Sequence, residues 1–210
     1  MKLFTLVTIL CGIFVASSSQ ANEIRGFYVG AGVGSSGLND HDSMFDERND
    51  VRTVNDDGNA FKLITGYQIT RIIALEAQYT NYGDIDITNP LKQHKTKYTW
   101  SPETLSFSAN TGYTFDNGLR PFALLGFSYI DLNESNKVLD KENYFGFRYG
   151  LGLEYTPPAL NGLSLRAGYE ADYFYIEDKE ESHTSIGKYK FYETYDFSLD
   201  SFYISISYKF

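Results

Sequence analysis

Residues 202–210 read FYISISYKF, and this stretch decides the fold class. Every even position, from Phe202 to Phe210, is apolar or aromatic, whereas the odd positions hold two serines, a lysine and a tyrosine. Such period-two alternation predicts a β-strand with one apolar face and one polar face, because successive side chains of a strand point to opposite sides.

The same split recurs through most of the chain, for example in residues 105–115 and 145–155. The eight segments that carry it are 26–35, 60–69, 72–82, 104–115, 119–129, 144–155, 163–176 and 196–210. An even number of such strands fits a closed antiparallel barrel. The sequence therefore predicts an all-β fold.

The connections between these segments alternate in length. Long polar stretches lie at 36–59, 83–103, 130–143 and 177–195, and short ones lie at 68–71, 116–118 and 156–162. The short ones include Asn117-Gly118, a strong signal for a tight hairpin. We therefore expect long loops at one end of the barrel and tight turns at the other.

Composition excludes several function classes. The 210 residues carry 18 Lys and Arg against 27 Asp and Glu, which gives a formal charge of −9, and Cys11 is the single cysteine. The acidic balance argues against nucleic acid as a partner, since binding phosphates requires clustered basic residues. One cysteine excludes a disulfide framework and a cysteine-based zinc site. We expect no metal or cofactor.

The N-terminal residues match a secretory signal peptide. Lys2 provides a positive start, residues 3–16 are apolar, and Ser19-Gln20-Ala21 is a small-x-small cleavage site. The apolar run is too short to cross a bilayer as a helix. We therefore expect residues 1–21 to be the signal peptide and residues 22–210 to form the barrel domain.

The polar faces distinguish a lipocalin-like barrel from a membrane barrel, because the two point their apolar faces in opposite directions. These faces carry mostly Gly, Ser and Thr, which suit a crowded interior. Their few charges are Lys62, Glu76, Arg148, Glu154, Arg166 and Glu170. The opposite faces of residues 27–33 and 73–79 carry no charge, which favours lipid as their neighbour.

Aromatic residues near the strand ends predict girdles at the two membrane interfaces. The residues expected there are Tyr79, Tyr82, Tyr129, Tyr155, Tyr173 and Tyr175.

Four stretches together resemble a known family. They are Thr65–Ile69 followed by Ala74–Ala77, then Gly150–Tyr155 and the terminal Tyr208-Lys209-Phe210. They are similar to the small outer-membrane β-barrels related to the OmpA transmembrane domain and OmpX. The resemblance implies an eight-stranded antiparallel transmembrane β-barrel in the cell outer membrane, with long surface loops and short periplasmic turns.

The resemblance also implies partners for such a barrel. Outer-membrane lipid and lipopolysaccharide would surround it, and the barrel-assembly machinery would read Phe210 and Tyr208 as an assembly signal.

An eight-stranded barrel is narrow enough for side chains to fill its interior. Relatives of the OmpA type carry an interior charged plug, and the candidates here for such a lumen network are Glu76, Arg148, Glu154, Arg166 and Glu170. Which of these pair depends on the shear of the barrel, and the charges could instead merely neutralise one another in a solvated lumen. A wide pore is not expected, and a small ion-conducting pore stays open as an alternative.

One motif suggests an enzyme. His183-Thr184-Ser185 resembles the His-x-Ser motif of outer-membrane lipid A deacylases, with Glu180 or Glu181 available to orient the imidazole. It lies in a strongly charged stretch, and a deacylase must meet acyl chains at the barrel wall. A lipid A-modifying enzyme is therefore the alternative, and the chain is expected to be no enzyme.

Any binding specificity of the protein is expected to lie in its surface loops. The stretch 36–59 is strongly acidic, which is typical of a solvated loop although clustered carboxylates can also bind divalent cations. The hairpin around Tyr173 to Tyr195 mixes lysines and carboxylates with Tyr189, Phe191 and Tyr192. Tyrosine-rich surfaces suit protein contacts. The sequence thus favours a structural role, or adhesion and colonisation through a host-surface or protein ligand.

Overall fold

The computed structural model describes residues 25–40, 53–55, 58–89, 96–135, 143–160, 162–184 and 187–210. The predicted signal peptide, residues 1–21, lies outside these ranges, so its prediction stays untested. No helix within the described ranges is long and apolar enough to cross a membrane.

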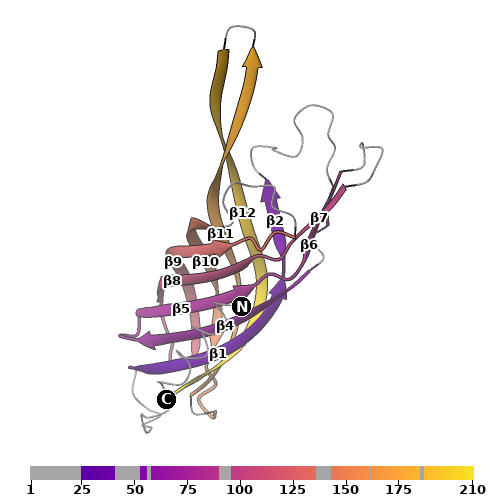
Figure 1. The fold of residues 1–210 in the computed structure, drawn as a ribbon. Coiled ribbons are helices and arrows are strands. Elements are labelled where there is room, and N and C mark those ends of the chain that lie inside the picture. Colours follow the sequence, from indigo (N-terminus) through magenta and orange to yellow (C-terminus); the bar gives the residue numbers. More distant parts are fainter. Residues whose placement is uncertain are drawn as a thin grey trace.

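Eight strands form a closed antiparallel barrel, as predicted (Figure 1). They are β1 (Gly26–Ser35), β4 (Asn59–Gln68), β5 (Ile73–Asn81), β8 (Glu103–Gly112), β9 (Leu119–Asp131), β10 (Asn143–Tyr155), β11 (Leu163–Thr184) and β12 (Gly187–Lys209). Each pairs with the next in this order, and β1 also pairs with β12, from Tyr28↔Lys209 to Gly34↔Tyr203. This last pairing closes the cylinder.

Four further strands lie in stretches predicted as polar loops. The strand β2 (Gly37–Asp40) continues beyond β1 and pairs with β12, while β3 (Thr53–Asn55), β6 (Ile85–Asn89) and β7 (Thr96–Trp100) form a small separate sheet. The loop prediction is wrong here because these segments are too short to show a clear alternation. Their pairing depends on partners distant in the sequence.

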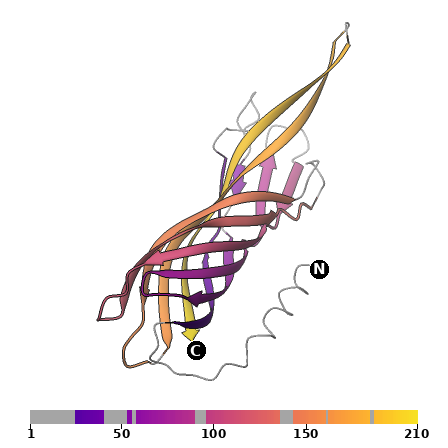
Figure 2. The ribbon, with the colours of Figure 1, turned by 90° about the vertical axis from the view of Figure 1, so that its left-hand side faces the viewer.

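The predicted loop at 177–195 is also mostly strand. The β11–β12 ladder continues past the barrel from Ile176↔Tyr195 to Thr184↔Gly187, so only residues 185 and 186 separate the two strands. Figures 1 and 2 show this hairpin projecting far beyond the barrel. We call the end from which it projects the loop end, and the opposite end the turn end.

Tight turns close the turn end, as the sequence predicted. In the turn at 116–118, the Leu119 amide donates to the Asn117 side chain at 3.0 Å, and Gly118 has a φ of +84°. A Cβ on Gly118 would lie 2.0 Å from the Thr156 carbonyl oxygen. Glycine is therefore required at this position by both conformation and space.

Alternate residues face opposite sides of the wall in the predicted sense. Phe202, Ile204 and Ile206 are 67%, 64% and 49% exposed on the outside, whereas Ser201 and Ser205 are buried in the lumen. An outer face of this kind is suited to lipid.

The predicted aromatic girdle is wrong for Tyr82. Its side chain is fully buried in the lumen, because it shares the parity of Glu76 and Gln78 and so points inward. Tyr155 and Tyr175 do lie exposed on the outer face.

A charge introduced on the outer wall should destabilise the barrel according to its depth. Ile206 pairs with Ala31, midway along β1, so Ile206→Arg is expected to cost about 2–4 kcal/mol of unfolding free energy. Tyr208→Arg, nearer the turn end on the same face, is expected to cost only about 0–1 kcal/mol. Urea titration of the barrel refolded into lipid vesicles measures both. Equal costs at the two positions would contradict a lipid-facing wall.

Candidate functional site

The middle of the lumen holds four buried charges, which we call the central cluster: Lys62, Arg148, Glu170 and Asp172. The Lys62 ammonium nitrogen lies 3.1 Å from Glu170 Oε2, and Arg148 Nη1 lies 3.6 Å from the same oxygen. Arg148 also donates from Nε and Nη2 to the two oxygens of Asp172, at 2.8 and 2.5 Å. All four side chains are at most 1% exposed, and their charges sum to zero.

Neutral groups also donate hydrogen bonds to these carboxylates. Gln78 donates to Glu170 Oε2 at 2.7 Å, and the Tyr82 hydroxyl donates to Asp172 Oδ2 at 2.9 Å. The Lys62 nitrogen also lies 4.9 Å from the ring centre of Tyr203, where the π face stabilises the cation. Buried charges persist only when paired and hydrogen-bonded in this way.

A second group lies nearer the turn end, and we call it the turn-side cluster: Glu76, Glu154 and Arg166. Arg166 Nη1 donates to Glu76 at 3.0 Å, while its Nη2 and Nε donate to Glu154 Oε2 at 2.8 and 3.1 Å. The Tyr28 hydroxyl donates to Glu76 Oε2 at 2.7 Å. The guanidinium also lies 4.8 Å from the ring centre of Phe122.

Strand register brings these groups together. On the β10–β11 ladder, Arg148 is opposite Asp172 and Glu154 is opposite Arg166, so two ion pairs are direct cross-strand neighbours. The other partners, Lys62 and Glu76, come across the lumen from β4 and β5.

The lumen also needs a small residue where a large ring crosses it. A Cβ on Gly66 would lie 2.3 Å from Cζ of Tyr28, so only glycine leaves room for the ring that reaches Glu76.

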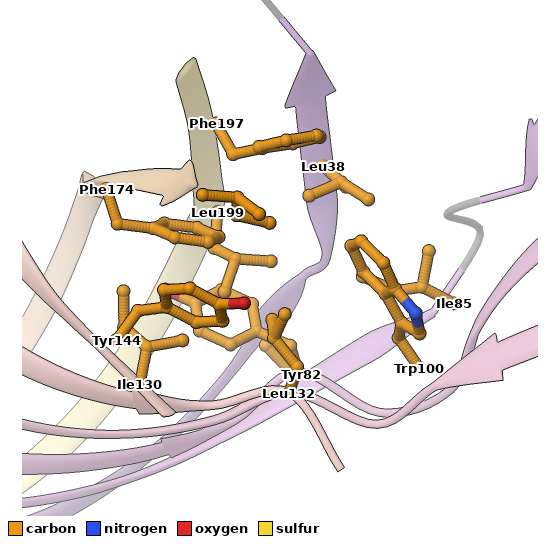
Figure 3. Packing of buried hydrophobic residues seen from close by; sticks show 12 residues of the cluster. Leu38, Tyr82, Ile85, Trp100, Ile130, Leu132, Tyr144, Phe174, Phe197 and Leu199 are labelled. Carbon is orange, nitrogen blue, oxygen red and sulfur yellow. The ribbon is translucent and has the colours of Figure 1, made fainter. Parts of the chain in front are cut away.

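An apolar cluster, here called the apolar cap, closes the loop end of the lumen (Figure 3). Rings from β11 and β12 stack in it, since Phe174 and Phe197 have centroids 5.9 Å apart, and Trp100 meets Phe197 edge-on at 6.3 Å. Its buried members are Leu38, Ala60, Tyr82, Ile85, Trp100, Ile130, Leu132, Tyr144, Phe174, Ile176, Phe197 and Leu199. Strands β2, β6 and β7 thus contribute side chains that close the mouth.

All five candidates for a lumen network lie in the lumen. Arg166 contacts Glu76 and Glu154, and Arg148 contacts Glu170, so the structure places them in two groups. Any role of these groups beyond filling the lumen stays a proposal.

Four lumen charges were not among those candidates: Lys62, Arg120, Asp172 and Lys209. Asp172 follows Glu170 by two residues and could have been found from parity alone, and Lys62 had been recognised only as an inward charge. Arg120 was missed because its inward neighbours Phe122 and Leu124 are apolar, so β9 shows no clean alternation.

Most residues on which the enzyme hypothesis depends lie outside the part of the chain that the structure describes. His41, His94 and Ser185 lie outside the described residues, as does most of the acidic stretch at 36–59. The backbone of His183 lies one residue before the end of β11, at the tip of the projecting hairpin.

Comparison with known proteins agrees with this architecture. A family model described as the outer membrane protein beta-barrel domain matches residues 7–210. No curated protein sequence matches this chain.

Solved structures share the fold. Neisserial surface protein A is 17% identical with a TM-score of 0.52, over 88% of this chain and 97% of that one. OprG from Pseudomonas aeruginosa is 14% identical with a TM-score of 0.57, over 88% and 96%. Ail, the attachment invasion locus protein of Yersinia pestis, is 14% identical with a TM-score of 0.51, over 88% and 99%. At these identities the likeness establishes the fold alone.

Removing one charged partner from the central cluster should lower the unfolding free energy of the barrel. Arg148→Met leaves Asp172 without its cation, and we expect a loss of about 3–5 kcal/mol of unfolding free energy. The double variant Arg148→Met with Asp172→Leu removes both charges and keeps the lumen balanced, so it should recover much of that loss. Urea titrations in detergent of Arg148→Met, Asp172→Leu and the double variant test this coupling. Simple additivity of the two single losses would argue against a paired, desolvated cluster.

Proposed function

The chain belongs to the outer membrane protein β-barrel domain family, and from that premise we propose that it is a non-enzymatic barrel whose loop end acts in adhesion or colonisation. In barrels of this type, the short turns face the periplasm and the longer connections face the cell exterior. The loop end is therefore the surface available to a host or protein ligand.

The projecting β11–β12 hairpin is the observation that carries this proposal. Its paired backbone adds nine residue pairs beyond the barrel, from Ile176↔Tyr195 to Thr184↔Gly187. The stretch includes Tyr189, Phe191 and Tyr192 in its sequence. An ordered, tyrosine-rich hairpin can contact a partner with little loss of conformational entropy.

The filled lumen opposes the alternative of an ion-conducting pore. The apolar cap covers the loop end, and below it the central cluster and the turn-side cluster occupy the interior. An ion crossing this lumen would have to displace paired charges and then pass a buried apolar layer, which is energetically unfavourable.

The geometry also favours a non-enzyme over a lipid A deacylase. A deacylase must present its catalytic groups to acyl chains at the barrel wall. The backbone of His183 is instead paired with Lys188 at the hairpin tip, seven ladder steps beyond the Ile176↔Tyr195 pair. This position is removed from the wall where acyl chains lie.

Ail is named as an attachment invasion locus protein. Because that likeness supports the fold only, adhesion of the present chain is inferred from its own hairpin.

Deleting the hairpin should remove most of the adherence and leave the barrel assembled. Glu177 pairs with Thr194, so residues 178–193 can be replaced by Asn-Gly without changing the register of the barrel. Bacteria expressing this variant should lose most binding to host cells or matrix, measured by adherence counts. Insertion of Gly-Ser into the turn at 116–118, at the opposite end, is the matched control and should bind normally. Unchanged adherence of the hairpin variant would contradict the proposal.

The proposed assembly signal predicts a role for the last aromatic pair. Phe210 donates its amide to the Phe27 carbonyl at 2.8 Å, and its ring meets Tyr208 edge-on at 5.2 Å. Phe210→Ala should slow outer-membrane assembly without blocking signal-peptide cleavage, because β12 must pair with β1 to close the sheet.

The barrel provides a matched control at the same end. Phe115 is similarly exposed and meets Tyr113 edge-on at the same centroid distance, 5.2 Å. Heat-modifiable gel migration of cell envelopes compares Phe210→Ala with Phe115→Ala. Equal assembly rates would mean that Phe210 is only another outward aromatic residue.

A further inference from the structure

The lumen has an open vestibule at the turn end. This cavity has a volume of about 320 Å³ and is lined by Arg120, Glu154, Ser164, Ser207 and Lys209 among others. Because the apolar cap covers the loop end, the vestibule is reached from the turn end, which faces the periplasm in this family.

The charges around the vestibule do not balance. The vestibule lining and the adjoining turn-side cluster contain four cations, Arg71, Arg120, Arg166 and Lys209, and three carboxylates, Glu76, Asp116 and Glu154. Four positive charges less three negative charges leave an excess of one. The central cluster cannot compensate it, because its own two cations and two carboxylates are already paired.

Two of these carboxylates, Glu76 and Glu154, are already engaged by Arg166. Its guanidinium lies 3.0 Å from Glu76 Oε2 and 2.8 Å from Glu154 Oε2. Arg120 approaches Glu154 Oε1 only to 4.0 Å, at the limit of an ion pair. Among the described residues, neither Arg120 nor Lys209 is therefore closely paired with a carboxylate.

These two cations have hydrogen-bond donors to spare. Arg120 is 3% exposed, and its Nε has no hydrogen-bond acceptor among the described residues. No carboxylate oxygen of a described residue lies within 4.0 Å of the Lys209 ammonium nitrogen. The strand position of Lys209, two residues after Ser207, points it toward the lumen. A buried donor without an acceptor and an unpaired cation both favour an anionic ligand.

We propose that the vestibule binds a phosphate group between Arg120 and Lys209. A guanidinium donates two parallel hydrogen bonds to such an oxyanion, and an ammonium contributes a further charge-assisted bond. The four oxygens of phosphate can use more of the available donors than the two oxygens of a carboxylate. Glu154 Oε1 lines the same cavity and limits the affinity by repulsion. The site is independent of the adhesive role proposed for the loop end.

Isothermal titration of the folded barrel with inorganic phosphate tests the site, in detergent without phospholipid. Lys209→Gln should weaken phosphate binding by about tenfold or more, as expected for loss of a charge-assisted hydrogen bond. Arg120→Gln should do the same, and if it fails to fold, Lys209→Gln still decides. Arg25→Gln, an exposed cation just before β1 that does not line the cavity, should bind as the wild type does. Heat-modifiable migration verifies that each variant is folded.

Two further titrations define the ligand. Glycerol phosphate binding comparable to inorganic phosphate would identify a phosphomonoester as a possible source, and binding of inorganic phosphate alone would identify the free ion. The proposal is overturned if the wild type binds no phosphate, or if Lys209→Gln and Arg25→Gln bind it equally well. Acetate binding as tight as phosphate binding would overturn the assignment to phosphate.

Discussion

Closure of the sheet is the constraint on which the rest of the structure depends. A backbone group left unpaired in hydrocarbon costs several kcal/mol, so a sheet that crosses a membrane must close on itself. Here β1 pairs with β4 along one edge and with β12 along the other, which leaves the barrel without an open edge. Closure with eight strands also makes the interior so narrow that side chains must fill it.

What fills the lumen follows from that narrowness. In the middle of the lumen the inward residues are cut off from water, and the charges there form a compensated set, the central cluster. Toward the loop end the filling changes to the apolar cap, for which strands outside the barrel provide Leu38, Ile85 and Trp100. The additional strands thus extend the packed interior beyond the membrane wall.

Period-two alternation predicted the barrel strands and most of their faces, because lipid and lumen impose opposite chemistry on neighbouring residues. The inward face of β9 is an exception, since Phe122 and Leu124 are apolar. The register between neighbouring strands could not be predicted from alternation. The pairing of Arg148 with Asp172 depends on the alignment of β10 with β11, which no local pattern encodes. Tyr82 was misplaced because residue type was considered without parity. The strands β6 and β7 were missed because five-residue ladders depend on partners distant in sequence.

The projecting hairpin lies outside the membrane, but its strand alignment depends on the barrel strands that it continues. An isolated two-stranded hairpin is marginally stable in water. In this chain, β11 and β12 keep one uninterrupted register from Leu163↔Tyr208 at the turn end to Thr184↔Gly187 at the tip. The membrane-embedded half of the ladder therefore fixes the strand alignment and twist of the half outside. A partner that bound the hairpin would meet a preorganised backbone, so less backbone entropy would be lost on binding than with a long flexible loop.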